Sequence, residues 1–471
     1  MVVVLSIASG CALERRKDNQ TVDIAPMEIE EVNVYSFDYI GGQDVMPIIG
    51  YYGPCPYMYS YDGNNQPSGV TDEYYQMIAE SGINILSYPQ NDYKTQPENV
   101  MKMLDLAHKY GIGQAVVDYN IAMNYEITRE EAVDFMKDYI NHPAYVGNFV
   151  WDEPGNTQFD SYRVNLSQLS NLSKVLNEEI GVWSYLNLLP ADPEETEPQV
   201  YVDYLKEFCE TQSPNVLLYD HYPDFDPESI SDQAAYIWNL AIVRQTAEEY
   251  KLPWWGYIGA GGQWNDEQVQ KESVDYYPDE GQFDWNVNTT LAFGAKGINY
   301  FAVSQPTHFA YGAEEGTYDF QRNCMIGAYG NKNEWYYYAQ NANKHIVAVD
   351  EILMNAVSKG VIVTAESEDL KKDFRYLNEE HLIDTSAIIQ GKAWRELTDV
   401  SGEALIGCFN FQGKTALYVV NYSYDYAQKI GLSFAKECNI KVIQDAATTY
   451  VKGDNLILDM SAGDGALIVF E

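Results

Sequence analysis

The sequence predicts a (β/α)8 TIM barrel followed by an antiparallel β-sandwich, and three observations favour this fold. Apolar, strand-like runs alternate eight times with amphipathic helical segments up to residue 357. After residue 357 this alternation stops, and short β-rich segments follow that are separated by Gly, Asn and Asp turns. The 471 residues leave room for a barrel and an accessory domain. We therefore expect a signal and tether over residues 1–35, a catalytic barrel over 36–357 and a β-sandwich domain over 358–471.

Each barrel strand is expected where a short run of aliphatic, β-branched and aromatic residues reaches a polar or glycine-containing break. Such runs occupy, in chain order, residues 44–52, 83–88, 114–120, 146–151, 181–187, 216–223, 254–258 and 297–303. A doubly wound sheet would alternate in the same way, but it rarely continues through eight units without interruption. The barrel is therefore the preferred architecture.

Helices are expected between these strands, where apolar residues recur at helical spacing. Thr71 has the residue type of an N-cap, and Gly111 follows the second helix as a terminator. The expected helices span residues 71–81, 97–110, 129–140, 162–179, 200–210, 233–251, 285–295 and 333–357. The strands of the sandwich are expected at residues 360–364, 405–409, 416–421, 429–434, 440–443, 455–458 and 466–470.

The composition limits the classes of partner. The formal net charge is −41, from 29 basic and 70 acidic residues, so the chain repels nucleic acids and strongly anionic polysaccharides. Aromatic residues make up 14% of the chain, and amphipathic rings are the side chains that stack on sugar faces. We therefore expect a neutral oligosaccharide or polysaccharide as substrate, and no nucleic-acid partner.

The N-terminus predicts a lipid anchor. A short apolar run ends in Ala8-Ser9-Gly10-Cys11, which resembles the lipobox of bacterial lipoproteins, in which the cysteine is lipidated. A polar stretch follows and would tether the domain to a membrane outside the cytoplasm. The alternative is a disordered apolar tag. No later run of eighteen apolar residues occurs, so we expect membrane contact only through the lipid on Cys11.

Neither a metal nor a cofactor is expected. The five cysteines other than Cys11 are an odd, widely scattered set, which is neither a disulfide framework nor a zinc pattern. No HxH or HExxH spacing occurs among the six histidines. The predicted strand ends also carry no Gly-rich phosphate loop and no Lys or Arg.

The fourth strand carries the most informative motif. It ends abruptly in Asp152-Glu153-Pro154-Gly155, because Pro154 cannot donate to a sheet ladder and Gly155 tolerates unusual dihedral angles. In a parallel barrel, the carboxyl ends of the strands form the catalytic face. The alternative is an acidic loop that caps the next helix.

Carboxylates, amides and aromatic rings dominate the other expected strand ends. The residues at this face are Tyr51, Tyr52, Tyr88, Asp118, Asn120, Trp151, Asp152, Glu153, Tyr185, Asn187, Asp220, His221, Tyr222, Tyr257, Gln263, Ser304 and Gln305. Trp151, Tyr222 and Tyr257 are expected to stack on a sugar ring. The substrate-binding candidates are Tyr52, Asp118, Trp151, Asn187, His221, Tyr222, Tyr257, Gln263 and Gln305.

Over residues 40–357 the chain resembles the (β/α)8-barrel glycoside hydrolases. Trp151-Asp152-Glu153-Pro154 is similar to the Asn-Glu-Pro that ends the fourth strand in the large retaining-glycosidase clan. The resemblance implies that Glu153 is the general acid/base, with Asp152 where the clan has asparagine. The segment 294–301 also looks like the eighth strand of such enzymes. In these enzymes a terminal sandwich usually supports the barrel, and a separate carbohydrate-binding role is the alternative.

The seventh strand departs from the clan's pattern and leaves the mechanism open. The clan places its nucleophilic glutamate at the end of that strand, but here Gly259-Ala-Gly-Gly-Gln263 follows, and Asp266 and Glu267 lie far into the loop. The Asp152–Glu153 pair is also similar to hexosaminidases in which the substrate's acetamido oxygen replaces the nucleophile. For both side chains to reach the site, the strand must bend, because neighbouring residues on a regular strand point to opposite sides.

Two further alternatives remain. Glu153 and Asp220, nearly across the barrel from each other, would suit an inverting mechanism if they are widely separated, although Asp220 could instead bind a sugar hydroxyl. The competing class of protein is a non-catalytic, glycan-binding surface lipoprotein that has kept the barrel and lost the nucleophile. The adjacent carboxylates weigh against it, because they repel each other and suit simple binding poorly.

Overall fold

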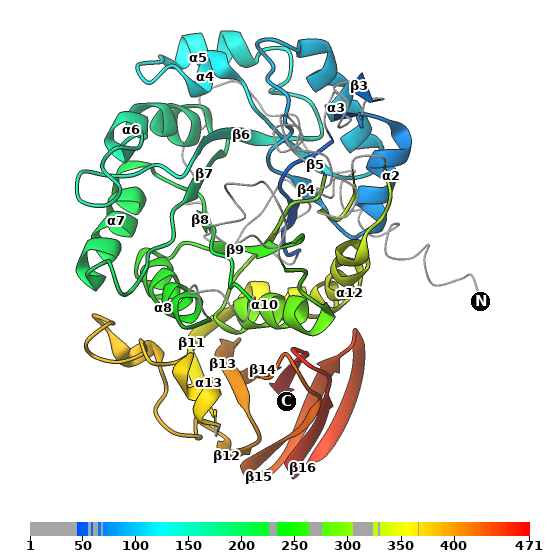
Figure 1. Cartoon of the computed structure of the whole chain (residues 1–471), viewed down its shortest axis with the longest axis vertical. Helices are drawn as coiled ribbons and strands as arrows, with labels where there is room; N and C mark the ends of the chain where they lie inside the picture. Colours follow the sequence, from blue (N-terminus) through cyan, green and yellow to red (C-terminus); the bar gives the residue numbers. More distant parts are fainter. Residues whose placement is uncertain are drawn as a thin grey trace.

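The computed structural model describes residues 45–54, 58–59, 65–66, 69–225, 233–262, 276–304, 324–327, 330–365 and 367–471. Within these ranges, eight parallel strands close into a barrel in the order β1-β10-β9-β8-β7-β6-β5-β4. Figure 1 shows these strands inside a ring of helices, with an antiparallel domain against one side of the ring. The predicted TIM barrel with a C-terminal β-sandwich is therefore confirmed.

The barrel elements follow the predicted order. The strands are β1 (Ile48–Gly50), β4 (Ile85–Leu86), β5 (Gly113–Val116), β6 (Tyr145–Asp152), β7 (Ser184–Leu188), β8 (Leu217–Tyr219), β9 (Trp254–Gly259) and β10 (Ile298–Phe301). The helices are α2 (Asp72–Glu80), α3 (Pro97–Lys109), α4 (Tyr119–Ala122), α5 (Arg129–Met136), α6 (Leu166–Lys174), α7 (Pro198–Thr211), α8 (Gln233–Tyr250), α10 (Glu280–Ala292) and α12 (Glu334–Asn355). Two short strands, β2 (Met58–Tyr59) and β3 (Asn65–Gln66), pair with each other.

The helix expected at 129–140 ends already at Met136, and two other helices begin at residues other than expected for a local reason. The expected helix at 162–179 begins only at Leu166, where Asn165 caps it, and it continues as a π-helix, η3 (Val175–Ile180), that ends at the left-handed Gly181. The helix expected from residue 285 already begins at Glu280, because Asp279 and Gln282 form a capping box. Thr71 accepts a hydrogen bond from the Tyr74 N–H and caps α2 as predicted.

The side chains of the barrel strands separate into two cores. Those that point inward, including Ile49, Ala115, Leu218 and Trp255, form a compact cluster inside the barrel. Those that point outward pack against the helices in a much larger cluster. A residue's cluster therefore shows which way its side chain points, and this matters for the residues at the strand ends.

The C-terminal domain is one seven-stranded sheet that folds over its own core. Its strands are β11 (Ala356–Val363), β12 (Leu397–Ser401), β13 (Ala404–Phe411), β14 (Lys414–Asn421), β15 (Gln428–Gln444), β16 (Ala447–Met460) and β17 (Gly465–Phe470). The strands predicted at 429–434 and 440–443 are a single long strand, β15. Its first half pairs with β12 and its second half with β17, and its register with β16 shifts between Ser433 and Cys438. Two short helices, α13 (Glu368–Lys372) and η4 (Thr385–Ala387), follow β11.

The barrel and the sandwich share an apolar core. Leu405, Phe409, Tyr418 and other side chains of the sandwich belong to the same cluster as the helices of the barrel. Tyr418 donates a hydrogen bond to Asn288 on α10 and contacts His345 on α12. One face of the sandwich is therefore buried against the barrel.

The chain passes from α12 to β11 without a loop. The helix ends at Asn355, and the strand begins at Ala356. The buried Lys296 amine donates to the carbonyls of Leu353 and Ala356 at this junction. Arg244 on α8 donates to the Ser358 hydroxyl at 2.7 Å, two residues into the strand. No helix among the described residues is long and apolar enough to cross a membrane.

Candidate active site

Strand β6 positions Asp152 by means of a bulge. Phe149 points into the barrel and Val150 points outward, as alternation requires. The register with β7 then shifts between Phe149 and Trp151, so Trp151 also points outward and Asp152 points inward. Without this extra residue, Asp152 would face the helices.

A second irregularity in β6 depends on Gly147. Its φ of +129° lies in a region that L-residues rarely adopt, and a Cβ there would meet the Trp183 carbonyl at 2.4 Å. The register with β5 shifts at the same place, between Gln114 and Val116. Glycine at position 147 therefore lets β6 run closely beside β7.

Glu153 continues the turn into the site. Its φ is +52°, which is uncommon for a residue with a side chain. Its N–H donates to the Asn187 carbonyl at 2.8 Å, so its backbone is fixed against β7. The bend that the Asp152–Glu153 pair requires therefore lies at Glu153 itself, rather than at Pro154.

Asp152 is held by two neutral donors. Tyr51 donates through its hydroxyl to Oδ2, and Asn187 donates through Nδ2 to Oδ1, both at 3.1 Å. Burial raises the pKa of Asp152, and the hydrogen bonds from Asn187 and Tyr51 and the charge of Arg163 offset part of this rise. Its orientation is therefore fixed from β1 and β7.

Glu153 is paired with a cation that the sequence did not indicate. Arg163 donates to Glu153 Oε2 and to Asp160, both at 2.6 Å, from the segment between β6 and α6. The Arg163 and Glu153 side chains are 34% and 29% exposed. Burial and the charge of Asp152 raise the pKa of Glu153, and Arg163 lowers it in part. The expectation that cations are absent from this face is therefore wrong for Arg163.

Asp220 follows β8 and completes a group of three carboxylates. Its Oδ1 atom is buried and has no hydrogen-bond partner among the described residues. Burial, together with the charges of Glu153 and Asp152, raises the pKa of Asp220 well above its ordinary value, while Asn187 acts in the opposite direction. The structure thus brings Asp152, Glu153 and Asp220 into one electrostatic cluster.

Aromatic rings surround this cluster. Tyr257 on β9 is 2% exposed, points inward, and lies 5.6 Å from Tyr51 and 6.3 Å from Tyr222 between ring centroids. Tyr52 packs on Tyr51 and Phe301, with ring centroids 4.8 and 5.4 Å away. Tyr52, Tyr222 and Tyr257 are therefore placed where a sugar ring could meet them.

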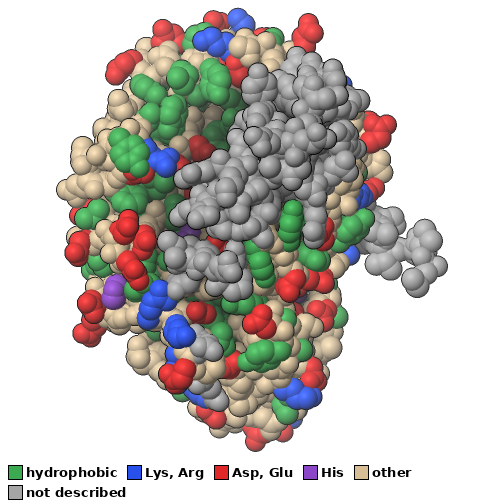
Figure 2. All heavy atoms as spheres, in the orientation of Figure 1, with side chains coloured by type: hydrophobic (Ala, Val, Ile, Leu, Met, Phe, Trp, Pro, Cys, Tyr) green, Lys and Arg blue, Asp and Glu red, His purple; other side chains and the backbone are tan. Residues whose placement is uncertain are grey.

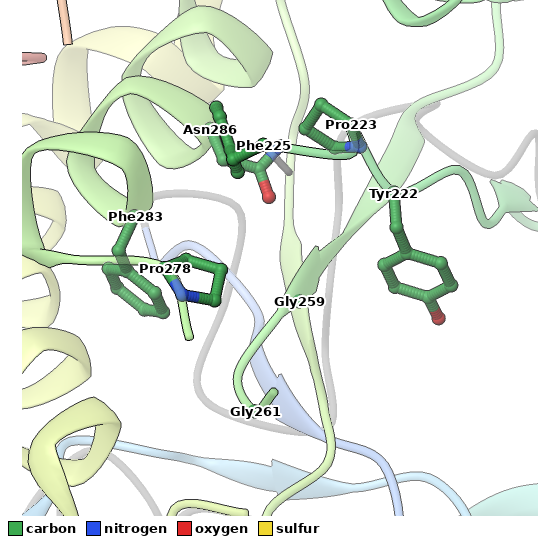
Figure 3. A pocket seen from close by; sticks show the side chains of 8 residues that line it. All are labelled: Tyr222, Pro223, Phe225, Gly259, Gly261, Pro278, Phe283 and Asn286. Carbon is green, nitrogen blue, oxygen red and sulfur yellow. The ribbon is translucent and has the colours of Figure 1, made fainter. Parts of the chain in front are cut away.

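A small pocket adjoins the cluster through Tyr222. Its wall is mostly apolar and consists of residues after β8, residues after β9 and the first turns of α10, including Phe225, Phe283 and Asn286. Figure 3 shows Pro278 against Phe283, and the Tyr222 ring directed away from Phe225. Asn286 donates to Tyr236 within the helix layer, so its amide nitrogen already has a partner.

Three predicted site residues lie elsewhere. Asp118 is 1% exposed, caps α4 and accepts a hydrogen bond from Tyr139 at 3.1 Å, so it faces the helices. Trp151 packs against the outer core, and His221 lies 5.6 Å from the Tyr236 ring. Burial lowers the pKa of His221 to about 4. Gln263, Gln305 and Cys11 lie outside the described residues, as do Asp266 and Glu267.

Sequence reasoning also missed functional candidates in the barrel. Tyr51 was placed at the face, but its bond to Asp152 depends on the β6 bulge, which leaves no clear signal in the sequence. Asn299 on β10 pairs in register with Tyr257, and both of its amide atoms are buried without partners among the described residues. Side chains alternate between inward and outward directions along β10, and this alternation could have identified Asn299 as a residue that points into the barrel. The described residues also contain no group of three His, Cys, Asp or Glu side chains that could hold a metal.

The sequence matches no family model and no curated protein. Solved structures do resemble it. A β-galactosidase from Bacillus circulans sp. alkalophilus aligns with 90% of this chain and 99% of its own, with a TM-score of 0.54 at 10% identity. A β-L-arabinopyranosidase from Geobacillus stearothermophilus aligns with 94% of this chain and 99% of its own, with a TM-score of 0.48 at 9% identity. At such a low identity, the likeness to the β-galactosidase shows the fold alone. The chain has the fold of (β/α)8-barrel glycoside hydrolases.

Proposed function

We propose that this protein is a glycoside hydrolase that cleaves O-glycosidic bonds in a neutral glycan. The observation that carries the proposal is the cluster of Asp152, Glu153 and Asp220, three carboxyl groups with raised pKa values at the carboxyl ends of β6 and β8. Glycosidic bond cleavage requires a carboxylic acid that keeps its proton near neutral pH, together with a second carboxylate. Tyrosine rings beside the cluster suit an uncharged sugar.

Glu153 is the proposed general acid/base. Among the described residues Arg163 donates to Oε2 of Glu153, so Oε1 is the oxygen that would protonate the leaving group. Burial and Asp152 favour its protonated form, and Arg163 limits the rise in pKa. A general acid whose pKa lies near the working pH serves best, because it must both give up and regain a proton.

Asp152 is proposed to orient the substrate. Its two oxygens each accept a hydrogen bond, from Tyr51 and Asn187, so the side chain is fixed without a neighbouring cation in direct contact. In a substrate-assisted mechanism, such a carboxylate accepts the N–H of a 2-acetamido group and stabilises the ring that its oxygen forms. Residues 259–262 after β9 carry no carboxylate, which supports this mechanism, while residues 263–275 lie outside the described residues.

The substitution E153Q tests the proposal. The amide keeps the shape of the side chain and cannot supply the proton, so turnover should fall about 10²–10⁴-fold while substrate affinity stays within about tenfold. E249Q, which removes a surface carboxylate paired with Lys206 at 2.8 Å, is the matched control. Hydrolysis of aryl glycosides at the wild-type rate by E153Q would remove Glu153 from the mechanism.

The second candidate function is glycan binding without catalysis. The Arg163–Glu153 ion pair favours it, because a cation in contact with the carboxylate favours loss of the proton. Parallel assays separate the two functions. Binding of oligosaccharides by wild-type protein that cleaves none of a broad panel of glycosides would support the binding protein.

We also propose display outside the cytoplasm through lipidated Cys11. The support is the Ala8-Ser9-Gly10-Cys11 run and the polar stretch that follows it. C11S should move the full-length protein from the membrane fraction to the soluble fraction. Equal partitioning of the two forms would contradict lipidation.

A further inference from the structure

Four neighbouring strands each direct one polar side chain into the barrel. The four side chains are those of Asn187 on β7, Asp220 directly after β8, Tyr257 on β9 and Asn299 on β10. We call this set of residues the polar arc. The register relates them, because Tyr219 pairs with Gly256, so the next residues, Asp220 and Tyr257, lie beside each other. Tyr257 in turn pairs with Asn299.

Within the part of the chain that the structure describes, every member of the polar arc has a buried polar atom without a hydrogen-bond partner. The atoms are Asn187 Oδ1, Asp220 Oδ1, the Tyr257 hydroxyl and both amide atoms of Asn299. Asn187, Tyr257 and Asn299 are 2%, 2% and 0% exposed. Buried polar groups in native proteins almost always have a hydrogen-bond partner, and leaving one unpaired is costly. Four such residues on consecutive strands therefore point to partners that enter from outside the chain.

The polar arc faces the carboxylate cluster rather than the helices. Tyr257 interacts electrostatically with Asp152, Asp220 and Glu153, and burial with these charges raises its pKa well above the ordinary value. Asn187 is oriented by its hydrogen bond to Asp152, which leaves Oδ1 directed away from that carboxylate. The orphaned atoms therefore border the site of the proposed reaction.

The opposite wall is aromatic. Tyr51 and Tyr88 stack with ring centroids 5.1 Å apart, and Tyr88 meets Phe149 at 4.8 Å. These rings come from β1, β6 and the end of β4. A site with donors and acceptors on one side and flat rings on the other matches a sugar ring, which has polar edges and apolar faces.

We propose that the polar arc binds hydroxyl groups of one pyranose ring of a neutral glycan, with Tyr257 as a hydrogen-bond donor. This inference rests on the proposed function and names the chemistry that the site recognises. A sugar hydroxyl both donates and accepts, so it can satisfy Asn187 Oδ1 and the Tyr257 hydroxyl alike. Tyr257 thereby acts as a specificity residue, in addition to its role as a ring that packs on the substrate.

The test measures binding apart from hydrolysis. Wild-type protein and Y257F are titrated calorimetrically with methyl glycosides of glucose, galactose, mannose and N-acetylglucosamine, and with the deoxy analogues of whichever binds. Loss of one neutral hydrogen bond should weaken binding of that glycoside by Y257F about 2- to 12-fold. The wild type should bind the deoxy analogue that lacks the contacted hydroxyl more weakly than the parent glycoside, by a similar factor. Y257F should bind this analogue and the parent glycoside equally well.

A stability measurement distinguishes a ligand-binding hydroxyl from a structural one. The Tyr257 hydroxyl has no hydrogen-bond partner among the described residues, so Y257F should leave the melting temperature of the free protein unchanged or raise it. Y300F is the matched control, because the Tyr300 hydroxyl on the outer side of β10 donates to Asn343 at 2.7 Å. Y300F should lower the melting temperature and leave glycoside binding intact.

Three outcomes would overturn the inference. In the first, Y257F and the wild type bind every glycoside equally well. In the second, the melting temperature of Y257F is as low as that of Y300F. In the third, the wild type binds no member of the panel. The first two would indicate that the arc holds buried water only. None of them decides the proposed function, because cleavage of a longer oligosaccharide and its loss in E153Q are measured separately.

Discussion

At the scale of single residues, the proton affinity of Glu153 depends on Arg163. The guanidinium contacts one oxygen of Glu153 and is itself paired with Asp160. It lowers the Glu153 pKa, in opposition to burial and Asp152. The cation therefore determines how alkaline the solution can become before the proposed acid loses its proton.

R163Q should accordingly shift the alkaline limb of the pH–rate profile. Without the guanidinium the Glu153 pKa rises further, so the protonated form persists to higher pH, and the alkaline limb should move to higher pH. The profile of kcat/KM against pH is the measurement. K137Q, which breaks an exposed pair with Asp134, should leave it unchanged. An alkaline limb that does not move in R163Q would assign that limb to another group.

D152N should reduce the rate far more than the binding of substrate. In the substrate-assisted mechanism Asp152 stabilises charge that develops only in the transition state, so kcat should fall on the order of 10²-fold with KM little changed. Y51F removes one of the two hydrogen bonds to Asp152 and should lower kcat about tenfold. N-acetylhexosaminides should be cleaved in preference to plain hexosides, and a thiazoline should inhibit. A fluorosugar that labels a carboxylate would contradict this mechanism.

At the scale of elements, the ends of the strands were predictable and their irregularities were not. Pro154 and Gly155 mark the end of β6 plainly, because their backbone chemistry stops a strand. The extra residue between Phe149 and Trp151 reverses the direction of every later side chain, and it leaves no compositional signal. This explains why Asp152 points into the barrel while Trp151, beside it, faces the helices.

Residues supplied by loops were the other omission. Arg163 follows Glu153 by ten positions, and no periodic pattern connects the two residues, which become partners only after the chain turns back. Asp118 was misplaced for a related reason. It occupies a strand end, but Asp is also a preferred helix cap, and here it caps α4.

Substitution of Gly147 tests the importance of the irregularity in β6 that lies beside β5. G147A should destabilise the protein by about 3 kcal/mol or more, because a strained φ is combined with a steric clash against the Trp183 carbonyl. G413A is the matched control: its φ is +84°, with nothing within 4 Å of the added methyl group, so about 1 kcal/mol is expected. Urea unfolding measures both. Equal losses would show that strain alone, without the clash, matters at Gly147.

At the scale of the whole molecule, charge is distributed unevenly between surface and interior. Figure 2 shows acidic side chains scattered over the visible face, consistent with a net charge of −41. In the interior, His345 on α12 is 9% exposed and contacts the Tyr418 hydroxyl of the sandwich at 3.0 Å. Burial lowers the pKa of His345 to about 4.

H345Q should make the protein less sensitive to acid. The folded-state pKa of about 4 lies below the unfolded value of about 6.5, so the contribution of His345 is complete above pH 6.5 and is lost as the pH falls toward 4. Between these limits the free energy of unfolding of the wild type should fall by about 3 kcal/mol more than that of H345Q. Urea unfolding at pH 7 and pH 4.5 measures the difference, with the exposed H108Q as control. An equal decrease in the free energy of unfolding of the wild type and H345Q would contradict this prediction.

The direct passage from α12 into β11 bears on how such proteins change over evolutionary time. Accessory domains joined by a linker can be exchanged between enzymes as cassettes, because few contacts cross the linker. Here the junction at Asn355 and Ala356 has no linker, Lys296 and Arg244 from the barrel bind the first residues of the sandwich side, and the two parts share one core. A recombination event that replaced the sandwich would remove side chains that now pack against the barrel's helices. An exchanged domain would therefore have to reproduce both this junction and the packing surface, which a simple cassette exchange does not provide.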